Sequence, residues 1–270
     1  MWADYPALQT GADIDYAPFS YREENGPEGF DIQFFSLLAE RMGLETAYNL
    51  DTWHEILSGA QRGELDIILG AVYSQEREEY LTFTAPYNSM QLALVVPEKS
   101  TLQYPEDLRN KEMAALRNDA VPKIFLDSSN IPVSAVSYPT LTEALRQLSS
   151  GRHDFAIIPE PYIDRLKNRR EFDNLRVAND NLSTLTYRIG VTEENRHLLP
   201  EINANIRKML ETSEYEELRE RWLFGGEETA AAGRNAVSRP ALLISIFGSL
   251  LIAGFFLFHI ALRKDQPTSI

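Results

Sequence analysis

Apolar residues recur at helical spacing early in the chain, over residues 31–42. Gly43 follows this segment, and glycine is a typical residue at the end of a helix. The apolar positions are Ile32, Phe35, Leu38, Ala39 and Met42. This period predicts an amphipathic helix.

A pattern of short helix, glycine turn and apolar strand occurs twice. Residues 53–71 predict a helix, a turn at Gly63 and a strand from Leu65. Residues 140–158 repeat this order around Gly151. Two similar α/β units predict two lobes, because a solenoid needs several shorter repeats.

Two β-prone segments, at residues 91–98 and 185–192, bracket the second unit and predict strands that cross between the lobes. An amphipathic helix predicted from Pro200 to Trp222 then returns the chain to the first lobe. An inserted second lobe and a double-strand hinge describe an α/β clamshell that closes on a ligand. The predicted boundaries are 1–95 and 188–226 for lobe 1 and 96–187 for lobe 2.

The segment from Ala241 to Leu262 is apolar over 22 residues and carries one titratable side chain, His259. About 20 apolar residues cross the hydrocarbon core of a bilayer. A buried core helix is the alternative, but a globular helix would show a polar stripe. The segment therefore predicts one C-terminal transmembrane helix, after a polar linker at 227–240 and before a short stub at 263–270.

The formal net charge of −14 argues against nucleic acid or an anionic membrane surface as a partner, since both require a basic patch. The absence of cysteine excludes disulfides, thiolate catalysis and cysteine-ligated metals. The four histidines are not at metal-ligand spacing, and no nucleophile motif is present. The sequence thus predicts a binding module without a cofactor or metal, and not an enzyme.

Three segments carry the strongest local signals: YAPFSY at 16–21, GFDIQFF at 29–35 and GELDIILGAVYSQER at 63–77. Together and in this order they resemble the family 3 extracellular solute-binding proteins. Members of that family are bilobed periplasmic clamshells, best known for binding amino acids, and the same module forms the sensory ectodomain of many membrane receptors. The resemblance covers essentially residues 8–225 and implies a periplasmic-binding-protein-like fold.

The resemblance makes Arg77 the first candidate for ligand binding. The family's Thr-x-Glu-Arg segment matches residues 74–77, and its arginine binds the ligand carboxylate. A guanidinium is a planar, bidentate partner that suits a carboxylate. The alternative is a surface arginine paired with Glu76 or Glu78, which would contribute little.

Aromatic side chains are expected to line the cleft of the first lobe, where the family buries the apolar part of its ligand. The candidates are Tyr16, Trp53 and Tyr73, with Phe19 assigned to the core, and core packing is the alternative for each. Asp13, at the end of the predicted first strand, either faces the cleft or caps a turn.

The set of residues with which the family binds an amino acid is only partly present. Ala71 and Val72 are expected to present backbone groups to the ligand, but Val72 stands where amino-acid binders commonly carry Ser or Thr. Asp31, in the GFD motif, is expected to cap the first helix and so to be structural.

The second lobe departs further from the family pattern. Asn118 and Asp119 lie near a predicted helix start, whose free N–H groups bind anions, although Asp119 would oppose an anion. Pro159 stands where the family places the aspartate that holds the ligand ammonium. The adjacent Glu160 either replaces that carboxylate or is an exposed loop acid.

These features predict the periplasmic sensory domain of a membrane-anchored receptor, closing on a small amino-acid-like or carboxylate ligand. The alternative is a membrane-tethered binding component of an ABC amino-acid importer, and a catalytic relative such as a cell-wall enzyme is a third hypothesis. The expected location is the inner membrane, with the clamshell in the periplasm or outside the cell and residues 263–270 in the cytoplasm. A homodimer and an output domain beyond this chain are implied by the resemblance alone.

Overall fold

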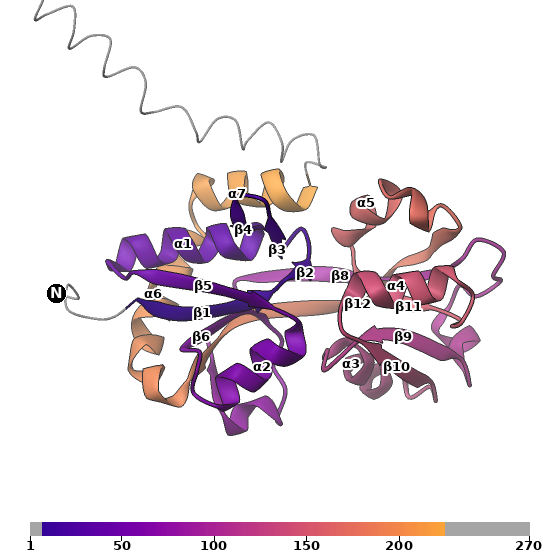
Figure 1. The fold of residues 1–270 in the computed structure, drawn as a ribbon, viewed down its shortest axis with the longest axis horizontal. Helices are drawn as coiled ribbons and strands as arrows, with labels where there is room; N and C mark the ends of the chain where they lie inside the picture. The colour runs from indigo at the N-terminus through magenta and orange to yellow at the C-terminus, as the bar shows by residue number, and fades with distance from the viewer. Residues whose placement is uncertain (1–6, 225–270) are drawn as a thin grey trace, which may run out of the picture. The chain divides into compact units, whose positions relative to one another are not determined.

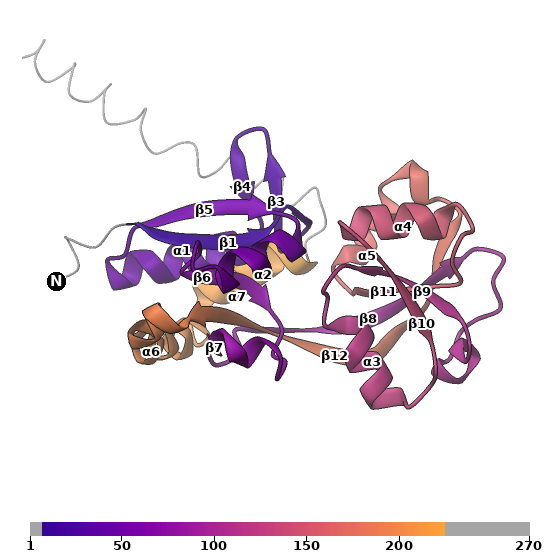
Figure 2. The same ribbon diagram turned by 60° about the horizontal axis from the view of Figure 1, so that its bottom comes forward.

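A computed structural model describes residues 7–224, apart from the side chains of Leu126, Ser128 and Arg165. These residues form two α/β lobes joined by two long strands (Figures 1 and 2). The two-lobed α/β architecture predicted from the sequence is confirmed.

The first lobe is built on three parallel strands, in which β1 (Leu8–Asp13) lies between β5 (Thr46–Asp51) and β6 (Ile67–Ala71). Helices α1 (Phe30–Met42) and α2 (Trp53–Gln61) cover opposite faces of this sheet (Figure 1). The strand order explains the opposite faces. The first crossover runs from β1 to β5 and the second runs back from β5 past β1 to β6, so two connections of the same hand place their helices on opposite sides.

Both predicted helices of the first lobe are confirmed, and Gly43 closes α1 at a left-handed φ of 68°. Along the chain, a small antiparallel sheet is formed by the residues between β1 and α1. It comprises β2 (Asp15–Tyr16), β3 (Ser20–Glu23) and β4 (Gly26–Glu28). This small sheet brings aromatic side chains next to the end of β1.

The second lobe repeats the α/β plan. Strands β9 (Glu112–Leu116) and β10 (Ser134–Tyr138) are parallel, and Met113 of β9 bridges in parallel to Phe155, just before β11. The remaining elements are η2 (Pro105–Leu108), α3 (Val121–Ser129), α4 (Leu141–Ser149), β11 (Ala156–Pro159), α5 (Tyr162–Lys167) and η3 (Arg170–Phe172).

Two long strands run through both lobes. Strand β8 (Asn88–Pro97) pairs antiparallel with β12 (Leu175–Thr192), from Leu175 opposite Pro97 to Tyr187 opposite Asn88. β11 joins β8, while β6 and the short β7 (Leu81–Phe83) join β12, so one seven-stranded sheet has the order β11-β8-β12-β6-β1-β5, with β7 beside β12. The predicted crossover strands are present, and the second begins ten residues earlier than expected.

The single helix predicted from Pro200 to Trp222 is wrong. The chain forms η4 (Glu193–Leu198) and α6 (Leu199–Met209), breaks, and then forms α7 (Ser213–Arg219) and the π-helical turn η5 (Glu220–Phe224). The break occurs because the Thr212 hydroxyl accepts the Tyr215 N–H at 3.3 Å and starts a new helix. The apolar face is nevertheless buried, as the period predicted.

The linker at 227–240, the apolar segment at 241–262 and the stub at 263–270 lie outside the described residues. Among residues 7–224, no helix combines the length and apolar character needed to cross a bilayer.

Candidate functional site

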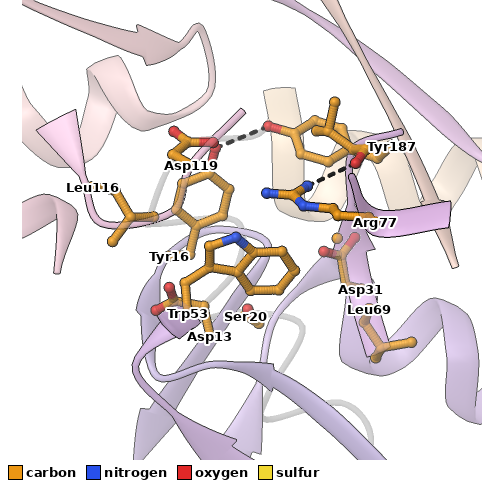
Figure 3. A pocket seen from close by; sticks show the side chains of 12 residues that line it. Asp13, Tyr16, Ser20, Asp31, Trp53, Leu69, Arg77, Leu116, Asp119 and Tyr187 are labelled. Atoms are coloured by element: carbon orange, nitrogen blue, oxygen red, sulfur yellow. Dashed lines mark hydrogen bonds between the residues drawn. The ribbon is translucent and has the colours of Figure 1, made fainter. Parts of the chain in front are cut away.

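A cavity lies between the lobes, at the carboxyl ends of the strands of both α/β units, where open α/β sheets usually bind ligands. Four charged side chains line it, together with three large aromatic ones (Figure 3). The charged residues are Asp13, Asp31, Arg77 and Asp119; the aromatic residues are Tyr16, Trp53 and Tyr187. Ser20, Leu69, Gly70, Val72 and Leu116 complete the lining.

The cavity is narrow and opens beside a much larger groove. It encloses about 20 Å³, which is close to the space that one water requires, whereas the outer groove encloses about 540 Å³. Arg77 and Asp119 line both spaces. These two residues therefore stand at the junction between the interior of the cleft and its mouth.

Arg77 connects the lobes. Its side chain is buried, with the residue 5% exposed, and its Nη1 donates to the Val72 carbonyl while its Nη2 donates to the Asn118 carbonyl, each at 2.7 Å. The guanidinium carbon lies 5.5 Å from the centre of the Trp53 ring. Burial lowers the pKa of Arg77, and the charge of Asp119 acts in the opposite direction. The hypothesis of a surface arginine paired with Glu76 or Glu78 is wrong.

Asn118 and Asp119 enter the site from the loop between β9 and α3. Asn118 adopts a left-handed φ of 59°, and its side-chain nitrogen lies 2.9 Å from Nδ1 of His54 in the first lobe. Asp119 Oδ1 accepts the N–H of Val121, the first residue of α3, at 3.3 Å. Burial raises the pKa of Asp119, and the charge of Arg77 lowers it in part.

Asp13 ends β1 and faces the cavity, so both of its predicted roles are present in the structure. Its Oδ1 accepts the Asp15 N–H at 2.7 Å, which closes a turn. Its Oδ2 is buried and has no partner at normal hydrogen-bond geometry among the described residues, although the nearby Trp53 backbone N–H partly offsets the rise in pKa that burial causes. Burial raises the pKa of Asp13 to about 7, with further raising by the charges of Asp15 and Asp119.

Asp31 is not the cap of α1, contrary to the prediction. The N-cap is Gly29, which has no side chain, and Asp31 is turned toward the cavity while the residue is 2% exposed. Its carboxylate accepts the Tyr87 hydroxyl, and that hydroxyl in turn accepts the Gly70 N–H at 3.1 Å. Asp31 Oδ1 has no partner in the described part of the chain, and burial raises the pKa of Asp31 to about 7.

The aromatic wall combines residues that are distant in sequence. The hydroxyls of Tyr16 and Tyr187 are hydrogen-bonded at 3.1 Å, and Phe19 packs against both rings with centroid distances of 5.4 and 5.0 Å. Burial raises the pKa of both tyrosines well above 10. Phe19 is fully buried, as predicted for a core residue.

Five of the nine predicted ligand-binding residues line the cavity: Asp13, Tyr16, Trp53, Val72 and Arg77. Asn118 and Tyr73 line the outer groove, where Tyr73 is 48% exposed and its hydroxyl donates to Glu78 at 2.9 Å. Ala71 is fully buried, Glu160 is exposed, and neither lines either space. Which of the nine bind ligand stays a prediction.

Sequence reasoning did not assign Asp31, Asp119 or Tyr187 to the site, nor the smaller lining residues Ser20, Leu69, Gly70 and Leu116. Asp31 was assigned to a helix start, where an aspartate has a sufficient structural explanation. Tyr187 lies in the predicted crossover strand. Side chains alternate between the two faces of a strand, and this alternation is the signal that could have placed Tyr187 on the cleft side.

The two lobes, the cleft between them and the buried arginine that contacts both define a clamshell ligand-binding protein. This chain belongs to the bacterial extracellular solute-binding proteins, family 3, whose family model matches residues 8–226. The resemblance stated from the sequence motifs is confirmed.

Relatives of this chain include both capture proteins and sensors. The L-cystine-binding protein TcyJ of Escherichia coli (strain K12) is 24% identical over 227 residues, which cover 82% of this chain and 84% of TcyJ. The virulence sensor protein BvgS of Bordetella bronchiseptica is 25% identical over 227 residues, which cover 83% of this chain and 18% of BvgS. A solved histidine kinase sensor domain with similarity to periplasmic binding proteins has a TM-score of 0.73 and 25% identity, covering 82% of this chain and 98% of that domain.

Proposed function

We propose that this chain is the periplasmic ligand-sensing domain of a membrane-anchored receptor, and that it closes on a small amino-acid-like or carboxylate solute. The observation that carries the proposal is the position of Arg77, which donates to Val72 of the first lobe and to Asn118 of the second. Because Arg77 contacts both lobes at the cleft, a ligand that binds Arg77 would be coupled to closure of the lobes.

The mechanism is a population shift. A ligand that contacts both lobes binds the closed form more tightly than the open form, and it stabilises closure only by that difference in affinity. The strands β8 and β12 connect the lobes, and β12 leads through η4 and α6 to α7. Closure would therefore act on the part of the chain that precedes the predicted span at 241–262.

Two observations favour a receptor over an importer component. The apolar segment at 241–262 would tether the module, whereas a capture protein must carry its solute to a permease. In addition, BvgS is named as a sensor, and the match to the solved kinase sensor domain covers 98% of that domain. The importer component is the alternative, and the name of TcyJ as an L-cystine-binding protein supports it.

The test is ligand-dependent closure of the anchored chain. Because the chain has no cysteine, Glu45→Cys in the first lobe and Lys167→Cys in the second can be spin-labelled selectively. The full chain in lipid nanodiscs is screened against amino acids, small carboxylates and amines, and the distance between the labels is measured. A solute that shortens this distance supports the proposal, and a distance unchanged by every solute refutes it.

Two variants and one binding assay sharpen this test. Arg77→Ala is expected to remove the solute-induced change, whereas Arg109→Ala, at an exposed position, is expected to retain it. Co-purification separates the two roles: a receptor is isolated without a transport ATPase, whereas retention of a permease and its ATPase would favour the importer.

A further inference from the structure

Acidic groups outnumber basic groups in the lining of the cavity. Asp13, Asp31 and Asp119 contribute three carboxyl groups, and Arg77 contributes one guanidinium. A carboxylate ligand would add a fourth acidic group to this narrow space. A cationic ligand would instead offset the excess, since a buried charge is stable only when it is paired.

The places that suit a ligand carboxylate are already filled by the chain. Arg77 donates from both terminal nitrogens to the backbone carbonyls of Val72 and Asn118. At the start of α3, where free N–H groups attract anions, Asp119 accepts the N–H of Val121. Asp119 and Arg77 line the same cavity, and the charge of each shifts the pKa of the other toward its charged form.

Two carboxyl oxygens remain without a partner in the cavity wall. Oδ2 of Asp13 and Oδ1 of Asp31 have no partner at normal hydrogen-bond geometry among the described residues, although the two residues are only 5% and 2% exposed. Burial raises the pKa of the Asp13 carboxyl, and the nearby Trp53 backbone N–H lowers it by less. A buried acceptor without a donor is costly, by about 1 to 3 kcal/mol in general. A ligand that brings N–H donors would satisfy them, and an ammonium brings three.

We propose that the site recognises a primary amine and that Asp119 fills, from within the chain, the position that a ligand carboxylate would need. The ammonium group is placed at Oδ2 of Asp13, in the cavity that Asp119 also lines. The Trp53 indole and the Tyr16 ring supply the aromatic surface on which the alkyl part of the amine packs (Figure 3). This inference rests on the proposed sensing function and replaces the ligand class named there with primary amines.

The experiment compares each amino acid with the amine that lacks only its carboxyl group. The pairs are lysine with cadaverine, ornithine with putrescine, and arginine with agmatine, titrated into the full chain by isothermal calorimetry. At least one amine is expected to bind as tightly as its amino acid or more tightly. The proposal is overturned if every amino acid that binds does so at least tenfold more tightly than its amine.

Two variants test the assigned roles. Asp13→Asn keeps the shape of the side chain and is expected to weaken amine binding at least tenfold. Asp119→Asn removes the negative charge at the start of α3, and the ratio of affinities is expected to move toward the amino acid. Asp180→Asn, at an exposed position, controls for the change in net charge. An affinity ratio that Asp119→Asn leaves unchanged contradicts the role given to Asp119.

The outcomes separate this inference from the proposed function. If only carboxylates or amino acids close the lobes in the spin-label assay, the amine proposal fails and the sensing function stands. If no solute moves the labels, the sensing function itself fails.

Discussion

The replacement Asp13→Asn gives a quantitative test of the electrostatic account of the cleft. Asp13 is 5% exposed, its Oδ1 accepts the Asp15 N–H at 2.7 Å, and its Oδ2 has no partner among the described residues. Asparagine retains an oxygen for the Asp15 N–H and carries no charge at any pH. The substitution therefore removes the titration of this group with little change in shape.

The sign of the effect follows from the two pKa values. The Asp13 carboxyl has an ordinary pKa of 3.8, and burial raises it to about 7 in the folded protein. Between these values the native state holds a proton that the unfolded state releases, so stability is highest below about pH 4 and falls as the pH rises through about 7. The charges that face Asp13 are Asp15 and Asp119, and both raise its pKa further.

The size of the effect follows from the same values. The change of pKa from 3.8 to about 7 corresponds to a loss of roughly 4 kcal/mol in the free energy of unfolding, at about 1.36 kcal/mol for each tenfold change in the protonation equilibrium. The asparagine side chain of the variant avoids this loss but buries an amide without a partner, at a cost of about 1 to 3 kcal/mol. We expect Asp13→Asn to be more stable than the parent above about pH 8 and less stable below about pH 4.

Urea unfolding of the parent and variant chains, followed by far-UV circular dichroism across this pH range, measures the difference directly. Asp31 titrates in both proteins, so its contribution cancels in the comparison. Asp180→Asn, at an exposed position, is expected to give a nearly constant difference from the parent. If the difference for Asp13→Asn is equally constant from about pH 4 to 8, Asp13 does not titrate as argued and the reasoning is refuted.

Three further predictions concern stability at one pH, measured by chemical unfolding. Gly70→Ala is expected to cost about 2 kcal/mol or more, because Gly70 has a φ of 66° and a Cβ there would lie 2.9 Å from Asp31 Oδ2; a neutral result would contradict this backbone geometry. Thr212→Ala is expected to cost about 1 kcal/mol through loss of the cap of α7, and Thr212→Ser should retain most of the stability. Tyr187→Phe is expected to cost about 1 to 3 kcal/mol because it leaves the buried Tyr16 hydroxyl without this partner, and an unchanged stability would show that the pair contributes nothing.

Local sequence patterns were sufficient for the two helices of the first lobe, the helix-turn-strand unit at 140–158 and the two crossing strands. The limits of α2 and the glycine that ends α1 follow from helical periodicity and from the conformational freedom of glycine, which act over a few residues. The prediction of one continuous helix from Pro200 to Trp222 was wrong at residues 210–212, because the apolar period continues through the break between α6 and α7. The Thr212 hydroxyl accepts the Tyr215 N–H at 3.3 Å and donates to the Met209 carbonyl at 2.6 Å, and these competing local interactions divide the segment into two helices.

The candidate site was predicted in part. Arg77 and Trp53 were predicted from the resemblance to the family, and Asp13 from its place at the end of the predicted first strand, where side chains of α/β proteins gather. Asp31 was assigned a different role, because its position in the sequence is equally consistent with a cap. Glu160 was considered for the site because it is adjacent to Pro159, and it lies outside both spaces.

The sequence by itself determined the order of α/β units, the two crossing strands and the family, because these depend on period, turn residues and motif order along the chain. The tertiary structure decided which charges share one cavity. Arg77 donates to the Asn118 carbonyl and shares a cavity with Asp119 only because β8 and β12 bring the lobes together. The effect of Arg77 and Asp119 on the pKa of one another depends on distance and burial. Distance and burial cannot be read from the spacing of residues along the chain. The acidic excess of the cleft and the presence of Asp119 and Arg77 in one cavity therefore became visible only in the folded structure.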